Sequence, residues 1–110
     1  MIGWVYLGVA IIAEVIGTSF LKESDGFSKL WPSIVTVIGY GVAIVGLSFA
    51  VKTIDVGIAY AVWAGLGTAL IVTVGWVVFG QQLDLGAWLG VAMIVGGVIV
   101  INVFSSTASA

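Results

Sequence analysis

Glu14 is the residue whose position predicts chemistry most directly in this sequence. It lies inside the apolar run Ile2–Leu21, which is long enough to cross a membrane. A carboxylate in hydrocarbon is costly, and acids inside membrane spans usually serve a binding or transport site. Ala10, Gly17 and Thr18 share its helical face. We therefore expect a functional site at Glu14, with room beside it for a ligand or another helix.

Aromatic side chains supply a second candidate wall for such a site. Tyr60 and Trp63 are one helical turn apart in a later apolar run, and Tyr40 carries a hydroxyl that can reach an acid. Aromatic rings attract a hydrophobic cation by stacking and cation–π contact, while the carboxylate supplies the countercharge. In the alternative interpretation the aromatic rings only pack, and a protonated Glu14 only hydrogen-bonds between helices.

The composition indicates that these residues belong to a membrane protein. The chain has 110 residues, of which 62% are hydrophobic and 7% are charged, whereas soluble domains carry about 25% charged residues. Backbone groups in lipid must pair within their own segment, so long apolar runs are expected to be helices. The sequence predicts one all-α domain, 1–110, with four transmembrane helices at about 2–21, 31–51, 56–80 and 85–104.

Several classes of function are excluded by residues that the chain lacks. It has no cysteine and no histidine, so thiolate and imidazole metal sites are absent, and we expect no metal and no cofactor. The net charge of −2 gives no basic surface for a nucleic acid. A single intramembrane acid offers little catalytic apparatus, so we expect that the protein is not an enzyme.

The distribution of lysines predicts insertion in both orientations. The links between the apolar runs are short, so successive helices are antiparallel, with Lys22 and Lys29 on one side of the membrane and Lys52 on the other. Orientation is normally set by a larger Lys/Arg asymmetry. At about 1.5 Å per residue, Glu14 lies roughly 18 Å and Trp63 roughly 10 Å below the N-terminal side. An inverted second copy would bring its Trp63 to about 20 Å, which favours an antiparallel homodimer. A single orientation is the alternative.

Glycines mark candidate hinge and packing positions. Gly65 and Gly67 interrupt the third run near its centre, where glycine weakens a helix and permits a kink, or else permits close packing. Gly86, Gly90 and Gly97 form a stripe on the fourth run, which predicts a contact surface for another helix.

Four segments together resemble the small multidrug resistance family. They are residues 13–18 (AEVIGT), 31–33 (WPS), 57–67 (GIAYAVWAGLG) and 80–85 (GQQLDL), and the likeness covers the whole chain. The resemblance implies a multi-pass protein of the bacterial cytoplasmic (inner) membrane. It further implies an antiparallel homodimer that exchanges protons for lipophilic, aromatic and quaternary ammonium cations.

The resemblance also implies roles for individual residues. Protons and cations would compete for Glu14 of both subunits. Tyr40, Tyr60 and Trp63 match positions that line the family's site, and Gly65, Gly67 and Gly97 match its hinge and packing glycines. The partners implied are a second copy of the chain, small lipophilic cations, protons and membrane lipid.

The subtype within the family is indicated by Gly17, where the guanidinium-exporting branch typically has tryptophan. The chain departs from the multidrug branch at Trp4, Ala43, Gln82 and Ser106, where that branch often has tyrosine, a polar residue or basic residues. The alternatives are a guanidinium exporter of the same family, a small membrane subunit that transports nothing, and a cation channel lined by Glu14.

Overall fold

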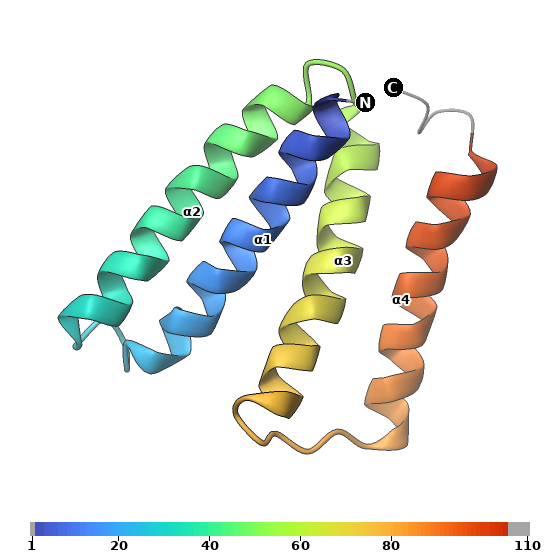
Figure 1. Cartoon of the computed structure of the whole chain (residues 1–110). Helices are drawn as coiled ribbons and strands as arrows, with labels where there is room; N and C mark the ends of the chain where they lie inside the picture. The colour runs from blue at the N-terminus through green and yellow to red at the C-terminus, as the bar shows by residue number, and fades with distance from the viewer. Residues whose placement is uncertain (1, 106–110) are drawn as a thin grey trace.

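A computed structural model describes residues 2–105 as four helices joined by short turns (Figure 1). The helices are α1 (Ile2–Glu23), α2 (Leu30–Ala50), α3 (Val56–Val77) and α4 (Leu85–Phe104). Each is long and apolar enough to cross a membrane, which confirms the predicted all-α membrane class. Successive helices run in opposite directions, so the start of α1 and the end of α4 lie at the same end of the molecule (Figure 1). Ser106 lies outside the described residues.

Four helix ends differ from the prediction, and for α2, at Leu30 and Ala50, each difference is one residue. The helix α1 continues beyond Leu21 to Glu23, since polar residues can extend a helix past its apolar run. The helix α3 ends at Val77 rather than at Gly80. Gly80 has φ +67°, a left-handed conformation that glycine adopts with little strain. The chain then turns back, and the backbone N–H of Gln81 donates to a carbonyl oxygen of α3 at 3.0 Å.

Small residues bring α1 and α2 into backbone contact. A Cβ atom added at Gly39 would lie 2.8 Å from a carbonyl oxygen of α1 and 3.1 Å from Cα of Gly17. Further along, a Cβ at Gly46 would lie 3.0 Å from Cβ of Ala10. The Thr36 hydroxyl donates to the carbonyl oxygen of Gly17 at 2.9 Å and ties the two helices together. The two helices therefore form one tightly packed hairpin, which carries Glu14.

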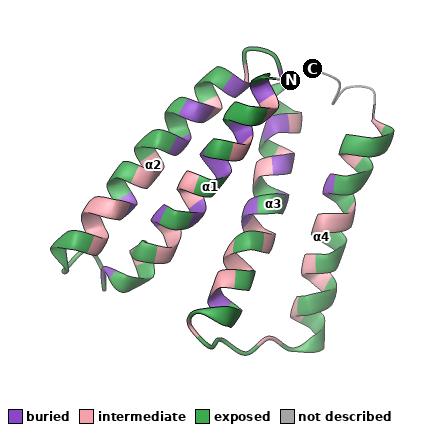
Figure 2. Cartoon of the chain, viewed as in Figure 1, coloured by how far each residue is buried: buried purple, intermediate pink, exposed green. Residues whose placement is uncertain are grey.

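The remaining packing is looser and leaves the molecule thin. Leu7 and Ile11 of α1 are buried in a cluster with Ala59 and Val62 of α3. Within the described chain, α4 packs mainly on α3, where Val98 is its one buried residue. The Cα atoms span 44 × 35 × 16 Å, which gives a nearly single layer of helices with wide exposed faces (Figure 2).

The glycines predicted to act in packing behave differently from one another. Gly65 faces the Val98 side chain, so it permits close approach of α3 and α4. Gly90 and Gly97 have space around them, because a Cβ at either would meet no non-neighbouring atom within 4 Å. No helix of the described chain covers these two glycines, and their contact role stays a prediction about a second copy.

The backbone contact of the α1–α2 hairpin predicts the effect of a single methyl group. Gly39→Ala should destabilise the protein by about 1–3 kcal/mol, because the added carbon meets backbone that cannot rotate away. The control is Gly41→Ala on the same helix, where a Cβ meets nothing within 4 Å. Loss of helicity in a detergent denaturation series measures both. Equal stability of the two variants would contradict the contact.

Candidate functional site

Glu14 lies half-buried in the middle of α1 and takes part in a short hydrogen-bond chain. Its Oε1 accepts from the Thr18 hydroxyl at 3.0 Å, and the Thr18 Oγ1 lies 2.7 Å from the Tyr40 hydroxyl. Since Thr18 has one hydroxyl proton and gives it to Glu14, Tyr40 must donate to Thr18. No basic side chain among residues 2–105 forms an ion pair with Glu14. The acid thus has hydrogen-bond donors but no fixed countercharge.

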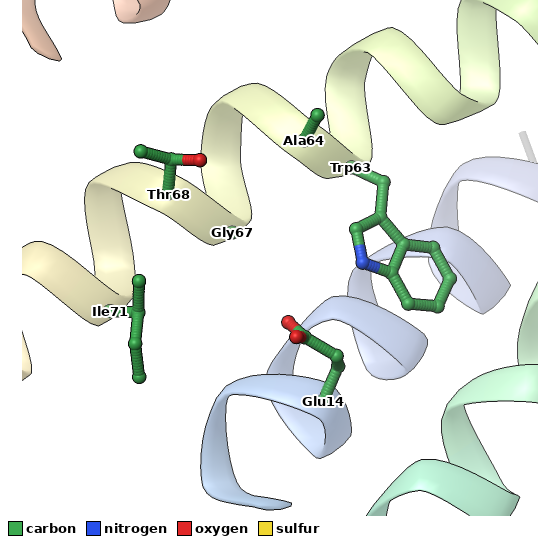
Figure 3. A pocket seen from close by; sticks show the side chains of 6 residues that line it. All are labelled: Glu14, Trp63, Ala64, Gly67, Thr68 and Ile71. Atoms are coloured by element: carbon green, nitrogen blue, oxygen red, sulfur yellow. The ribbon is translucent and has the colours of Figure 1, made fainter. Parts of the chain in front are cut away.

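The free side of Glu14 opens into a pocket of about 140 Å³ between α1 and α3. A Cβ added at Gly67 would lie 3.5 Å from Oε2 of Glu14, so the glycine leaves α3 bare opposite the carboxylate. Figure 3 shows the indole of Trp63 beside the acid, with its nitrogen-bearing edge turned toward the carboxylate. The pocket is lined by Glu14, Trp63, Ala64, Gly67, Thr68 and Ile71.

This arrangement suits a cation better than any other ligand class. The carboxylate can neutralise one positive charge, and the Trp63 ring can supply cation–π and stacking contact. Within residues 2–105 there is no group of three or more acidic residues that could hold a metal ion. The pocket therefore offers one charge and one aromatic wall, which is the recognition chemistry of a hydrophobic cation.

Two small residues expected beside the acid face a different neighbour. Ala10 is fully buried and packs against Gly46 of α2. A Cβ at Gly17 would lie 3.0 Å from Cδ1 of the Tyr40 ring, so that ring fills the room which Gly17 leaves. Neither residue lines the pocket, and the space predicted beside Glu14 opens toward α3 instead. Tyr40 reaches the acid only through Thr18.

Of the two predicted aromatic residues of α3, Trp63 and Tyr60, only one reaches the acid. Trp63 lines the pocket with Glu14 of its own chain. The depth estimate from helical rise placed Trp63 of an inverted second copy, and not Trp63 of the same chain, at the level of Glu14. It did not predict that one chain brings the two residues together, because it placed backbone positions and left out the lengths of the side chains. Tyr60 is 66% exposed and does not line the pocket. A single chain therefore brings Trp63, but not Tyr60, to the acid.

Thr68 and Ile71 line the pocket but were not among the predicted site residues. The signal for them was present in the sequence. Ile71 lies four residues after Gly67, and Thr68 lies four residues after Ala64. Both therefore continue the helical face that carries Trp63.

Comparison with known proteins identifies the family of the chain. The family model described as Small Multidrug Resistance protein matches residues 2–94. The chain belongs to the small multidrug resistance family. It is 50% identical over 109 residues to the quaternary ammonium compound-resistance protein QacE of Escherichia coli, covering 99% of both chains. It is 48% identical over 102 residues to the multidrug transporter EmrE of Escherichia coli K12, covering 93% of both.

A more distant relative comes from another bacterial group. The multidrug resistance protein EbrB of Bacillus subtilis is 43% identical over 102 residues, which cover 93% of this chain and 87% of that protein. Four membrane-spanning helices together with these relatives make the chain a multi-pass protein of the bacterial inner membrane. The similarity extends through Glu14 and the α3 face, so it includes the pocket.

Proposed function

We propose that this protein exports lipophilic aromatic and quaternary ammonium cations across the inner membrane in exchange for protons. The observation that carries the proposal is the Glu14 carboxylate, which faces Trp63 across a pocket and has no ion-pair partner among the described residues. Relatives named for multidrug and quaternary ammonium resistance support the choice of substrate class.

Exchange follows because a proton and a cation would both bind the same group, the Glu14 carboxylate. A carboxylate in hydrocarbon needs a positive charge beside it, which either a proton or a cation can supply. Both would use the same oxygens of Glu14, so each displaces the other. The donor chain from Tyr40 through Thr18 stabilises the ionised form when the proton has left, and it holds Oε1 in place.

The pocket walls favour bulky cations over guanidinium. Among its lining residues only Glu14 and Thr68 have side-chain oxygens. Guanidinium loses many hydrogen bonds to water and needs polar partners to replace them. A quaternary ammonium or phosphonium ion has no N–H groups, and it gains from the apolar and aromatic contacts of Trp63 and Ile71.

A second, oppositely oriented copy completes the proposed transporter. The single chain is thin, its α4 stripe at Gly90 and Gly97 is uncovered, and Tyr60 projects from α3 without a hydrogen bond among the described residues. An inverted copy would cover these surfaces and bring a second Glu14 to the midplane. If the two copies adopt different conformations and exchange them, the shared site opens to alternate sides of the membrane.

The exchange mechanism predicts proton release on cation binding. Adding tetraphenylphosphonium to the purified protein in weak buffer should release protons, and Glu14→Gln should abolish both release and binding. Glu23→Gln, on the exposed end of the same helix, is the matched control and should behave as the unmodified chain. Binding without proton release would refute the exchange. Conductance without proton counterflow would indicate a channel, and no effect of Glu14→Gln would indicate a non-transporting subunit.

The aromatic wall predicts a selective loss of affinity. Trp63→Ala should weaken binding of planar aromatic cations by roughly five- to thirtyfold, because it removes stacking and cation–π contact. The control is Trp76→Ala on the same helix, since Trp76 is exposed and contacts Trp88 at 5.4 Å between ring centroids instead of the pocket. Fluorescence titration compares the two variants. Equal affinities would show that Trp63 only packs.

The antiparallel arrangement predicts two orientations in one membrane. The chain has no cysteine, so Gln82→Cys introduces a single exposed thiol in the α3–α4 turn. A membrane-impermeant maleimide should label about half of the molecules in intact cells, because the lysine asymmetry is small. The remainder should label after permeabilisation. Complete labelling, or none, before permeabilisation with transport intact would exclude the antiparallel homodimer.

A further inference from the structure

A second hollow lies between α1 and α2, the two helices that run side by side in the hairpin (Figure 1). It has a volume of about 500 Å³, and none of its lining residues lines the Glu14 pocket. A smaller hollow of about 230 Å³ shares Ile38 and Val42 with it. The two hollows therefore form one groove along the hairpin, the hairpin groove.

Small residues form the groove and leave it apolar. Gly46 packs against Ala10 and brings the two helices close together, while a Cβ atom at Gly41 would meet no atom within 4 Å. In the larger hollow only Tyr6 has a polar side-chain atom, and its hydroxyl has no hydrogen bond within residues 2–105. Such a surface can be covered in a membrane by a hydrocarbon chain.

A cation lies at the end of the groove that is nearest the membrane surface. The Phe49 ring lines the groove and stacks on the Tyr6 ring, with 5.2 Å between the ring centroids. The Lys52 ammonium lies 4.8 Å from the centroid of the same Phe49 ring. Because α2 ends at Ala50, Lys52 follows the membrane-spanning segment and lies at the level of the lipid headgroups.

The Lys52 ammonium has no counter-ion in the described part of the chain. It forms no ion pair with a carboxylate of residues 2–105, and the acid nearest to it in sequence, Asp55, begins α3. The side chain is exposed, so its N–H groups remain available to a ligand. An apolar groove that ends at an unpaired cation is complementary to a molecule with a hydrocarbon chain and an anionic head.

We propose that the hairpin groove binds an anionic phospholipid, with one acyl chain in the groove and the phosphate at Lys52. From Ile38 to Phe49 the groove is about 16 Å long at about 1.5 Å per residue, close to one leaflet's half of a ~30 Å hydrocarbon core. The headgroup of a chain lying there would reach Lys52, whose ammonium can donate a charge-assisted hydrogen bond to a phosphate oxygen. The inference does not depend on proton exchange.

The test compares two lipids that have the same acyl chains. Native mass spectrometry of the purified protein in detergent measures binding of dioleoylphosphatidylglycerol, which is anionic, and dioleoylphosphatidylcholine, which is zwitterionic. The unmodified protein should prefer the anionic lipid. Lys52→Gln should weaken its binding about fivefold, the effect of one lysine beside anionic lipid, and leave the zwitterionic lipid nearly unchanged.

The matched control for charge is Lys29→Gln. Lys29 lines neither hollow and contacts no aromatic ring within residues 2–105, so its variant should keep the preference for the anionic lipid. An equal loss of preference in the Lys52 and Lys29 variants would show general attraction by positive charge and would overturn the site.

A second pair of variants tests the groove itself. Gly41→Leu puts a side chain into the hollow and should weaken binding of both lipids by a similar factor, whereas Gly41→Ala should weaken it less. Leucine and alanine favour a helix more than glycine does, so the fold should persist, and circular dichroism checks this for each variant. Glycerol phosphate, a headgroup without chains, should not displace the anionic lipid.

The remaining outcomes identify other occupants. Unchanged lipid binding in folded Gly41→Leu would overturn the groove as the place of the acyl chain. If that variant instead changed only the oligomeric state, the groove would be an interface between copies. Displacement by glycerol phosphate would assign Lys52 to a free phosphate. Tetraphenylphosphonium binding separates this inference from the proposed function, because its absence in the unmodified protein would refute cation export and leave the lipid result standing.

Discussion

A carboxylate placed in hydrocarbon is the constraint from which the rest of this structure follows. Glu14 must have either a positive charge or a proton beside it, because the isolated anion is too costly at that depth. The protein provides hydrogen-bond donors on one side, through Thr18 and Tyr40, and leaves the other side open to the pocket. The open side is what makes the acid available to an external ligand.

The helices contribute differently to the site because they differ in how closely they pack against one another. The α1–α2 hairpin is held at its backbones by Gly17 and Gly39, and it fixes both Glu14 and its donors. The helix α3 contributes the opposite wall of the pocket, and it contacts the hairpin less closely. The helix α4 packs mainly on α3 and exposes most of its surface (Figure 2). A single chain therefore encloses the pocket only in part.

Much of this arrangement could be predicted from the sequence, because the bilayer limits what apolar runs can do. Four long runs must become four helices, and short links must make neighbours antiparallel. Glu14 and Trp63 stood out, since an acid in an apolar run and an aromatic on a helical face carry strong signals. The end of α3 at Val77 could not be predicted, because Val78 and Phe79 are as apolar as the helix and only Gly80 marks the turn.

Residue roles on a shared face were harder to predict, because the helical period gives a direction but not a neighbour. Ala10 and Gly17 lie on the face of Glu14 in sequence, yet in the structure they face α2, and the Tyr40 ring fills the space at Gly17. Thr68 was missed for a related reason. A threonine in a helix normally bonds to its own backbone, and only the three-dimensional structure shows that this one does not.

Glu14 and its hydrogen-bond donors lie on the α1–α2 hairpin, whereas the rest of the pocket lining lies on α3. This arrangement has a consequence for how such a protein can change over generations. Substitutions on α3, at positions such as Ala64, Thr68 or Ile71, would alter the lining of the pocket without touching the hairpin that holds Glu14. Under the proposed function, proton exchange at Glu14 would thus stay constant while the range of exported cations changed by single codon changes. Selection by a new disinfectant would act first on one face of one helix.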